Sequence, residues 1–383
     1  MKNVKQLLNA KGNAMHYIIA AWLFLFMLMP VARVKAQHKE VIIGYVGGYR
    51  GLVNADVIAA KKLTHINYAF VDILNNRAWL HKEATDTINF RNLNLLKKQN
   101  PALKILISIG GWAWSGRFSD AVLTDTSRQG FARSAIDIVN KYNLDGVDID
   151  WEYPARPGNT GNIYRPEDKH NYTLMFAEIR RQLDSLQKQT HKPYLLTTAV
   201  GGFKSFLDNT EMNIAQQYLD YINLMTYDFG NRVAGHHTNL YASKKYTSDE
   251  NADNAVKAYI NAGVPAAKLV MGIAFYGKTS ILTNNATSGL GDSVVSRSRG
   301  RGYTIIKDSL VNVAAYKTYR DEDAKAPYIY NAETHEFITY DDEWSVKEKC
   351  KYVKGNAMGG VMFWEYNSDV KGYLLDEINR DLK

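Results

Sequence analysis

The chain has almost no cysteine: Cys350 is the only one among 383 residues. A single cysteine excludes an intramolecular disulfide and a metal cluster built on thiolates. The sequence also lacks low-complexity tracts and any block of Lys and Arg with interleaved aromatic residues, so nothing in it favours nucleic-acid binding. Hydrophobic residues make up 46% and charged residues 22%, which excludes a disordered chain and is typical of a large globular protein.

No apolar run reaches the roughly 20 residues that a helix needs to cross a bilayer. The best candidate, residues 17–29, follows a stretch with three lysines and precedes small residues before Gln37. This order is typical of a secretory signal. We therefore expect 1–36 to be removed, with Met15 as an alternative start and an uncleaved membrane anchor as the alternative interpretation. The mature protein, 37–383, would then be secreted or periplasmic, without a stable membrane partner.

The positive charge is concentrated in the expected signal. Residues 1–36 carry five basic side chains and no acidic ones, so removing them from the formal net charge of +8 leaves +3. That balance gives little support for nucleic acid as a partner. A short basic patch at 297–301 is predicted to be a solvated loop.

Apolar, β-branched segments alternate with amphipathic segments along the chain. Strands are predicted at 41–46, 64–71, 104–109, 144–150, 194–200, 220–226, 268–275 and 359–364. Helices are predicted between them, for example at 88–99, 126–142, 167–188 and 250–262. Eight strands, mostly followed by helices, favour a parallel sheet closed into a (β/α)8 TIM barrel of the α/β class. An open doubly wound sheet is the alternative, but no glycine-rich phosphate loop follows the first strand.

The connection between the seventh and eighth strands is too long for a simple loop. Residues 278–341 are predicted to form a small α+β insertion on the carboxyl side of the barrel. Within it, we expect short strands at 303–306, 328–330 and 336–340, and a helix at 308–320.

The most informative segment is 144–154, LDGVDIDWEYP. Side chains alternate between the faces of a strand, so Asp148, Asp150 and Glu152 share one face. The opposite face is apolar and would meet the helices, and it carries Val147, Ile149 and Trp151. Asp145 does not follow this alternation and is interpreted as structural.

Three carboxyl groups in a row inside a barrel repel one another, so at least one holds a proton at neutral pH. Glu152 lies at the carboxyl end of its strand, where barrel enzymes carry out their chemistry. A protonated carboxylic acid there is suited to donate a proton to a leaving group. The alternatives are a buried polar network and a Mg²⁺ or Ca²⁺ site, but no phosphate-binding motif accompanies the row.

With this row of carboxyl groups, the sequence resembles glycoside hydrolase family 18, the chitinases. The segment 144–154 matches the DxxDxDxE signature of that family. Residues 108–112 (SIGGW) resemble its SxGG motif, 225–228 (MTYD) its MxYD motif, and 360–365 (GVMFWE) its motif on the eighth strand. Tyr45 on the first strand and 68–70 (YAF) on the second also fit, so the resemblance covers the whole mature chain.

The resemblance implies substrate-assisted catalysis without a cofactor or metal. Glu152 would protonate the glycosidic oxygen, while the substrate's own N-acetyl carbonyl attacks the anomeric carbon and forms an oxazolinium ion. Asp150 would hold the acetamido N–H, and Asp148 could share its proton. Tyr227 would donate a hydrogen bond to the attacking carbonyl.

The resemblance also implies the residues that bind substrate. Trp364 would form the floor under the sugar at subsite −1, and Trp112 a platform at +1. Tyr45 and Ser108 resemble residues that hold the Asp148 end of the row, with simple core packing as the alternative. The remaining predicted binding residues are Phe70, Gly110, Gly111, Tyr153, Met225 and Asp228.

Two departures from the family pattern are visible. Lys278 stands where the family often has arginine, and the loop 229–241 lacks a tryptophan that many relatives place there. Lysine lacks the bidentate fork of arginine, so a subsite contact is expected to be weaker. The missing tryptophan puts one stacking contact on the leaving-group side in doubt.

The sequence therefore predicts a secreted, monomeric chitinase that cuts β-1,4 bonds between N-acetylglucosamine units of chitin or its oligosaccharides. Two alternatives remain open: an endo-β-N-acetylglucosaminidase acting on N-glycans, and a chitin-binding lectin of the same fold. A lectin would typically have lost the acid, whereas Glu152, Asp150 and Tyr227 are all present.

Overall fold

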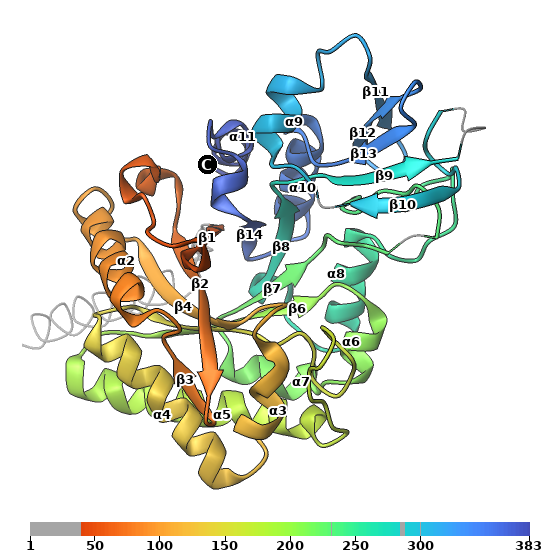
Figure 1. Cartoon of the computed structure of the whole chain (residues 1–383). Helices are drawn as coiled ribbons and strands as arrows, with labels where there is room; N and C mark the ends of the chain where they lie inside the picture. Colours follow the sequence, from red (N-terminus) through yellow and green to blue (C-terminus); the bar gives the residue numbers. More distant parts are fainter. Residues whose placement is uncertain (1–39, 231, 284–287, 299) are drawn as a thin grey trace, which may run out of the picture. The chain divides into compact units, whose positions relative to one another are not determined.

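The computed structural model describes residues 40–383, apart from 231, 284–287 and 299 (Figure 1). The expected export signal, residues 1–36, lies outside the described residues. Among the helices that are described, none is both long and apolar enough to cross a membrane.

Eight parallel strands form a closed barrel. Their neighbour order is β1, β14, β8, β7, β6, β5, β4 and β2, and β2 pairs again with β1. The strands are β1 (Val41–Gly47), β2 (His65–Leu74), β4 (Lys104–Gly110), β5 (Gly146–Asp150), β6 (Leu195–Gly201), β7 (Tyr221–Met225), β8 (Leu269–Ala274) and β14 (Gly360–Trp364). This closure confirms the predicted (β/α)8 barrel. A short strand, β3 (Arg77–Trp79), adds an antiparallel partner to β2.

Helices cover the outside of the barrel (Figure 1). The longer ones are α2 (Glu83–Leu95), α4 (Asp125–Lys141), α5 (Asp168–Thr190), α8 (Ala252–Asn261), α10 (Glu343–Gly355) and α11 (Tyr373–Leu382), and the short ones are α3 (Phe118–Ala121), α6 (Lys204–Asp208) and α7 (Met212–Ala215). Local sequence explains several starts. Thr124 caps α4 and Asp342 caps α10, each in a reciprocal capping box with the serine three residues later.

The apolar face of β5 packs outward against the helices, as its alternation predicts. Trp151 is buried, and its ring stacks on Phe118 at 5.0 Å between centroids and meets Tyr172 edge-on at 5.9 Å. Val147 and Ile149 lie in the same core. With these three side chains outside, the carboxyl groups of Asp148 and Asp150 are left inside the barrel.

The long connection between β8 and β14 forms its own antiparallel sheet, which confirms the predicted α+β insertion. The order of its strands is β10, β9, β13, β12 and β11. The elements are β9 (Lys278–Leu282), β10 (Val294–Ser298), α9 (Tyr303–Ser309), β11 (Lys317–Asp321), β12 (Ala326–Asn331) and β13 (Glu336–Thr339).

Two local predictions in the insertion are wrong. The predicted strand 303–306 is the first part of α9: Tyr303 and Ile306 are buried three residues apart, while Ile305 is 54% exposed, which is a helical period. The predicted helix 308–320 ends at Ser309, and Lys317–Asp321 is a strand instead. Pairing with β12 favours the strand, because it stacks the rings of Tyr319 and Tyr328 at 4.8 Å between centroids.

The basic patch at 297–301 was predicted to be a solvated loop, but part of it is a strand. Arg297 and Ser298 belong to the exposed edge strand β10. Arg301 forms an ion pair with Glu336 at 2.9 Å on β13. Edge strands commonly carry charged side chains, which discourage pairing with other chains.

Candidate active site

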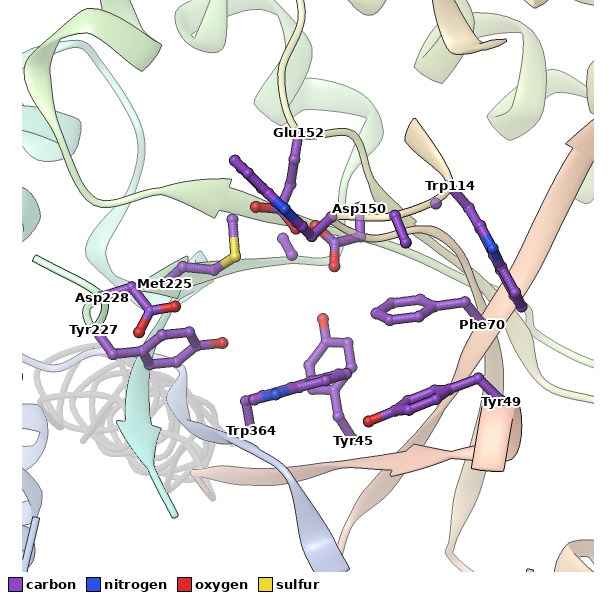
Figure 2. Close-up of a pocket in the computed structure, with 14 residues that line it drawn as sticks. Tyr45, Tyr49, Phe70, Trp114, Asp150, Glu152, Met225, Tyr227, Asp228 and Trp364 are labelled. Carbon is purple, nitrogen blue, oxygen red and sulfur yellow. The ribbon is translucent and has the colours of Figure 1, made fainter. Parts of the chain in front are cut away.

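The three carboxyl groups of β5 lie in a row from the barrel interior to the mouth of a cleft. Asp148 is fully buried, Asp150 is 5% exposed, and Glu152 lies two residues beyond the end of the strand. Figure 2 shows Asp150 and Glu152 turned into one cavity, with Tyr227 and Trp364 facing them.

The inner carboxyl group is held by four neutral donors. Tyr45 Oη and Ser108 Oγ donate to Asp148 Oδ2 at 2.9 and 2.7 Å. Thr197 Oγ1 and Asn223 Nδ2 donate to Asp148 Oδ1 at 2.5 and 3.3 Å. Tyr45 and Ser108 thus lie where the resemblance placed them, at the Asp148 end of the row. Burial raises the pKa of Asp148, and the hydroxyl and amide donors oppose that rise.

The middle carboxyl group has a much poorer environment for a charge. Burial, and then repulsion from Glu152 and Asp148, raise the pKa of Asp150 well above its usual value. Among the described residues, none donates a hydrogen bond to the buried Oδ1 of Asp150. This oxygen is therefore open to a donor from outside the chain.

The outer carboxyl group is held through its backbone. Ser115 Oγ accepts from Glu152 N at 2.9 Å, and Asn162 Nδ2 donates to Glu152 O at 3.0 Å. The same serine hydroxyl lies 3.0 Å from the carbonyl oxygen of Asp150. Burial raises the pKa of Glu152 to about 7, although the Tyr153 hydroxyl beside it acts in the opposite direction. Near neutral pH this carboxyl group can therefore hold a proton and release it.

Gly110 and Gly111 allow β4 to approach the carboxyl row. Both have positive φ, +107° and +76°. A Cβ on Gly110 would lie 2.3 Å from the carbonyl oxygen of Asp150, and one on Gly111 would lie 2.6 Å from the ring of Phe70. The two glycines are thus required for packing around the site.

An aromatic surface forms the floor of the first cavity. The Trp364 ring lies 5.4 Å from Phe70, 5.8 Å from Tyr45 and 6.4 Å from Tyr49, measured between centroids. The cavity has a volume of about 520 Å³ (Figure 2). Its lining consists of Tyr45, Tyr49, Phe70, Gly110, Trp112, Ala113, Trp114, Asp150, Glu152, Ala199, Met225, Tyr227, Asp228 and Trp364.

Tyr227 points into the cavity opposite Asp150 and Glu152 (Figure 2). Burial, and then the charge of Asp150, raise the pKa of Tyr227 well above its usual value. The hydroxyl therefore stays protonated at neutral pH and can act as a hydrogen-bond donor. The neighbouring Met225 lines the same wall.

Asp228 is paired rather than free. Lys278 Nζ lies 2.8 Å from Asp228 Oδ1, Tyr276 Oη donates to the same oxygen at 2.5 Å, and His237 Nδ1 is 3.6 Å away. Burial alone would raise the pKa of Asp228, but His237 and the positive charge of Lys278 outweigh it and hold the pKa below its usual value. Asp228 is therefore a stable anion at the edge of the cavity.

A second cavity of about 590 Å³ continues from the first. The two share Trp112, Glu152, Met225, Tyr227 and Asp228, so the cleft runs past Glu152 on both sides. The second cavity adds Tyr153, Arg156, Pro157, Gly201, Phe203, Ser205, Phe229, Gly230, Glu250 and Lys278. Trp112, 51% exposed, stands at the junction.

A row of carboxyl groups on the fourth barrel strand, above an aromatic floor, indicates a glycosidase. The family model for glycosyl hydrolases family 18 matches residues 41–369. The chain belongs to this family. This family 18 protein is 37% identical to Chitinase A1 of Niallia circulans, and the match covers 93% of this chain and 60% of that relative. It is 32% identical to Chitinase B of Serratia marcescens, and that match covers 84% of this chain and 76% of the relative.

Solved family 18 structures are also similar. A glycoside hydrolase family 18 N-acetylglucosaminidase from Paenibacillus barengoltzii shares 38% identity with a TM-score of 0.83, and the match covers 89% of this chain and 99% of that one. The Group IV chitinase of Ostrinia furnacalis shares 26% identity with a TM-score of 0.82, over 90% and 99%. The chain spans 60% of the length of the Niallia relative.

The structure brings most of the predicted site residues of this family 18 protein to the two cavities. Asp148, Ser108 and Gly111 are the exceptions, because they are buried and line neither cavity. Asp145 is structural, as interpreted: it pairs with Lys97 at 2.6 Å and Lys192 at 3.0 Å. Among the described residues, no cluster of His, Cys, Asp or Glu could hold a metal ion.

Sequence reasoning missed Thr197, Asn223, Tyr49, Trp114 and Arg156. The first two face the barrel interior from strands whose positions were predicted, so the alternation along those strands could have identified them. Tyr49 and Trp114 lie just after β1 and β4, at the carboxyl ends where barrel sites form. No motif marks Arg156.

Proposed function

We propose that this protein is a chitinase that hydrolyses β-1,4 bonds between N-acetylglucosamine units by a substrate-assisted, retaining mechanism. The observation that carries the proposal is the Asp148, Asp150 and Glu152 row, with Tyr227 facing it across an aromatic floor. Relatives named as chitinases support the substrate class.

Glu152 is the general acid. A carboxyl group with a pKa near 7 keeps its proton in a large fraction of molecules at neutral pH, and it lies where the two cavities join. It protonates the glycosidic oxygen as the bond to the leaving sugar breaks. The resulting carboxylate then takes a proton from the water that opens the intermediate.

The nucleophile is the carbonyl oxygen of the substrate's own acetamido group. Most retaining glycosidases use a second carboxylate for a covalent intermediate, but that role requires an ionised nucleophile. Asp150 is buried and flanked by two carboxyl groups, which disfavours its charge. Delivery of the nucleophile within the bound substrate gives a high effective concentration instead.

Asp150, Asp148 and Tyr227 orient the acetamide. Its N–H would donate to the open Oδ1 of Asp150, and Tyr227 Oη would donate to its carbonyl oxygen. Positive charge develops on the nitrogen as the oxazolinium ion forms, and a proton shared between Asp150 and Asp148 lets Asp150 become negative at that moment. Stabilisation that grows in the transition state is what accelerates the reaction.

The N-acetyl requirement tests the mechanism. Fully deacetylated oligomers should be inert even where they bind, and a thiazoline analogue of the oxazolinium ion should inhibit strongly. NMR of a fresh digest should detect the β-anomer of the product first. An initial α-anomer, or a glycosyl adduct on Asp150 or Asp148, would contradict the mechanism.

Product profiles test the substrate class. We expect cleavage of N-acetylglucosamine oligomers and colloidal chitin, and no glycan release from a high-mannose glycoprotein. Release of monomer alone would match the N-acetylglucosaminidase named among the similar structures. Glycan release would support the endo-β-N-acetylglucosaminidase alternative, and binding without cleavage would support the lectin alternative.

We further propose that the catalytic unit, 37–383, is exported as a monomer after removal of 1–36. Mass spectrometry of exported protein should give a mature chain that begins at Gln37. An intact Met1 or Met15 start in the membrane fraction would contradict this proposal.

A further inference from the structure

Arg156 occupies an unusual position in the second cavity. It lies four residues beyond Glu152, and its guanidinium sits over two aromatic rings, 4.6 Å from the centroid of Phe203 and 5.1 Å from that of Tyr153. Tyr153 and Phe203 in turn meet edge to face at 5.3 Å. Stacking of this kind fixes the plane of a guanidinium while leaving the N–H groups on its rim free to donate.

The guanidinium N–H groups of Arg156 have few hydrogen-bond acceptors within the protein. Within the described part of the chain, Arg156 has no carboxylate within ion-pair distance, and its buried Nη1 has no hydrogen-bond acceptor. A guanidinium carries five donors, and buried donors are normally satisfied. An arginine that serves only to support the fold would be expected to use them.

The charges around Arg156 favour a neutral ligand over an acidic one. The second cavity contains Glu250 and Asp228 as well as Lys278. Asp228 is engaged by Lys278 at 2.8 Å, and Glu250 accepts from the backbone N–H of Gly230 at 2.7 Å. With both signs present, the matching partner for Arg156 is an uncharged acceptor such as an amide carbonyl oxygen.

The proposed function, on which this inference rests, identifies which side of the cleft receives the leaving group. If the first cavity holds the sugar over Trp364, the second cavity, beyond Trp112 and Glu152, receives the leaving part of the substrate. The loop 229–241 has no tryptophan to stack on a sugar there. Phe203 and Arg156 together supply an apolar face and a directed donor in the same cavity.

We propose that Arg156, supported by Phe203 and Tyr153, forms a sugar subsite on the leaving-group side that binds the N-acetyl carbonyl of the sugar placed there. Arg156 is thus a specificity-determining residue rather than part of the proton-transfer machinery. It selects substrates that extend beyond the cleaved bond and that remain acetylated on that extension.

The test compares two substrates in Arg156→Ala. One is a chitin tetrasaccharide, which places sugar in the second cavity, and the other is 4-nitrophenyl N,N′-diacetylchitobioside, whose leaving group is not a sugar. We expect kcat/KM for the tetrasaccharide to fall roughly tenfold or more, as for loss of a charged donor. The value for the nitrophenyl substrate should stay within about twofold of wild type.

Two further variants separate geometry from charge and from general damage. Arg156→Lys keeps the charge but loses the planar fork, so it should show most of the loss on the tetrasaccharide. Arg117→Ala changes an exposed arginine after β4 that lines neither cavity, and it should leave both substrates unaffected. Unchanged nitrophenyl hydrolysis also reports that each variant is folded.

The acetyl specificity has its own measurement. A tetrasaccharide acetylated at the sugars over the first cavity but deacetylated on the leaving side should already be poor for wild type, with no further loss in Arg156→Ala. Equal losses on both original substrates, or no loss on either, would overturn the proposed subsite. Preference for an acidic sugar on that side would also overturn it. Failure of wild type on every substrate would instead overturn the proposed function.

Discussion

The two ends of the carboxyl row on β5 differ in how the protein treats a negative charge. At the inner end, Asp148 is fully buried but accepts four hydrogen bonds from neutral side chains. At the outer end, the hydrogen bonds that hold Glu152 run to its backbone N–H and carbonyl groups. The same strand therefore presents a carboxyl group built to tolerate charge and another built to keep a proton.

The same chemical group can therefore have different roles at different positions along one strand. Desolvation acts on all three carboxyl groups, but only at Asp148 do several donors oppose it. The environment thus pushes the proton toward the middle and outer positions. Pairs of titratable groups with different environments are the usual basis for dividing acid and base roles.

Removing the outer carboxyl group should have the largest effect. In Glu152→Gln the amide cannot donate the proton, so kcat should fall by roughly 10²–10⁴-fold. Oligosaccharide affinity, measured by calorimetry, should be retained. Glu322→Gln, in an exposed turn of the insertion, is the matched control and should keep full activity. Activity of Glu152→Gln within about tenfold of wild type would remove Glu152 from the acid role.

The raised pKa of Glu152 predicts that activity and stability depend on pH. Activity should fall as the pH rises above about 7, because Glu152 then loses its proton. Its pKa is higher in the folded protein than in the unfolded chain, so its contribution to stability is present at low pH and is lost as the pH rises through 7. Glu152→Gln should therefore raise the Tm relative to wild type at pH 8 and leave it nearly unchanged at pH 4. A larger gain at pH 4 would contradict this sign.

Weakening the inner end should have an intermediate effect. Ser108→Ala removes one donor to Asp148, and loss of a buried hydrogen bond to a charged group costs about 1–3 kcal/mol of unfolding free energy. Burial already raises the pKa of Asp148, and losing the donor raises it further, so the destabilisation should grow with pH. Urea unfolding at pH 5 and 8 measures it. Ser309→Ala, on the surface of α9, should show neither effect.

The smallest effect is expected outside the row. Lys278→Ala removes the partly exposed ion pair with Asp228, a type of interaction worth about 0–1 kcal/mol. We expect KM to rise less than about fivefold and kcat to change little. Lys244→Ala breaks an exposed pair with Asp323 in another part of the chain and serves as the control. A loss comparable with that of Glu152→Gln would place Lys278 in the proton-transfer machinery.

The sequence predicts the barrel and the carboxyl row well because both depend on local patterns. The alternation in 144–154 alone is enough to place Asp148 and Asp150 inside and Trp151 outside. The four donors to Asp148 are harder to predict, since they come from four other strands and meet only when the barrel closes. Thr197 and Thr198 are adjacent in sequence, and the strand register decides that Thr197 faces Asp148.

The insertion resists prediction for a different reason. Residues 303–306 (YTII) are aromatic and β-branched, which favours a strand, yet they form a helix because Tyr303 and Ile306 share one buried face. Residues 317–321 become a strand only because β12 lies beside them. Arg156 escapes prediction altogether, since its stacking partner Phe203 is far along the chain and no motif links the two.

The closure of the barrel also sets an order in time. Val41 pairs with Gly360, so the first strand of the sheet takes its second partner from nearly the end of the described chain. While the polypeptide is being made, β1 and β8 remain open edges until β14 emerges. Unpaired edges invite association with other chains. We expect newly made chains to need protection from aggregation until Trp364 has left the ribosome, which makes the last strand the step that commits the molecule to its native state.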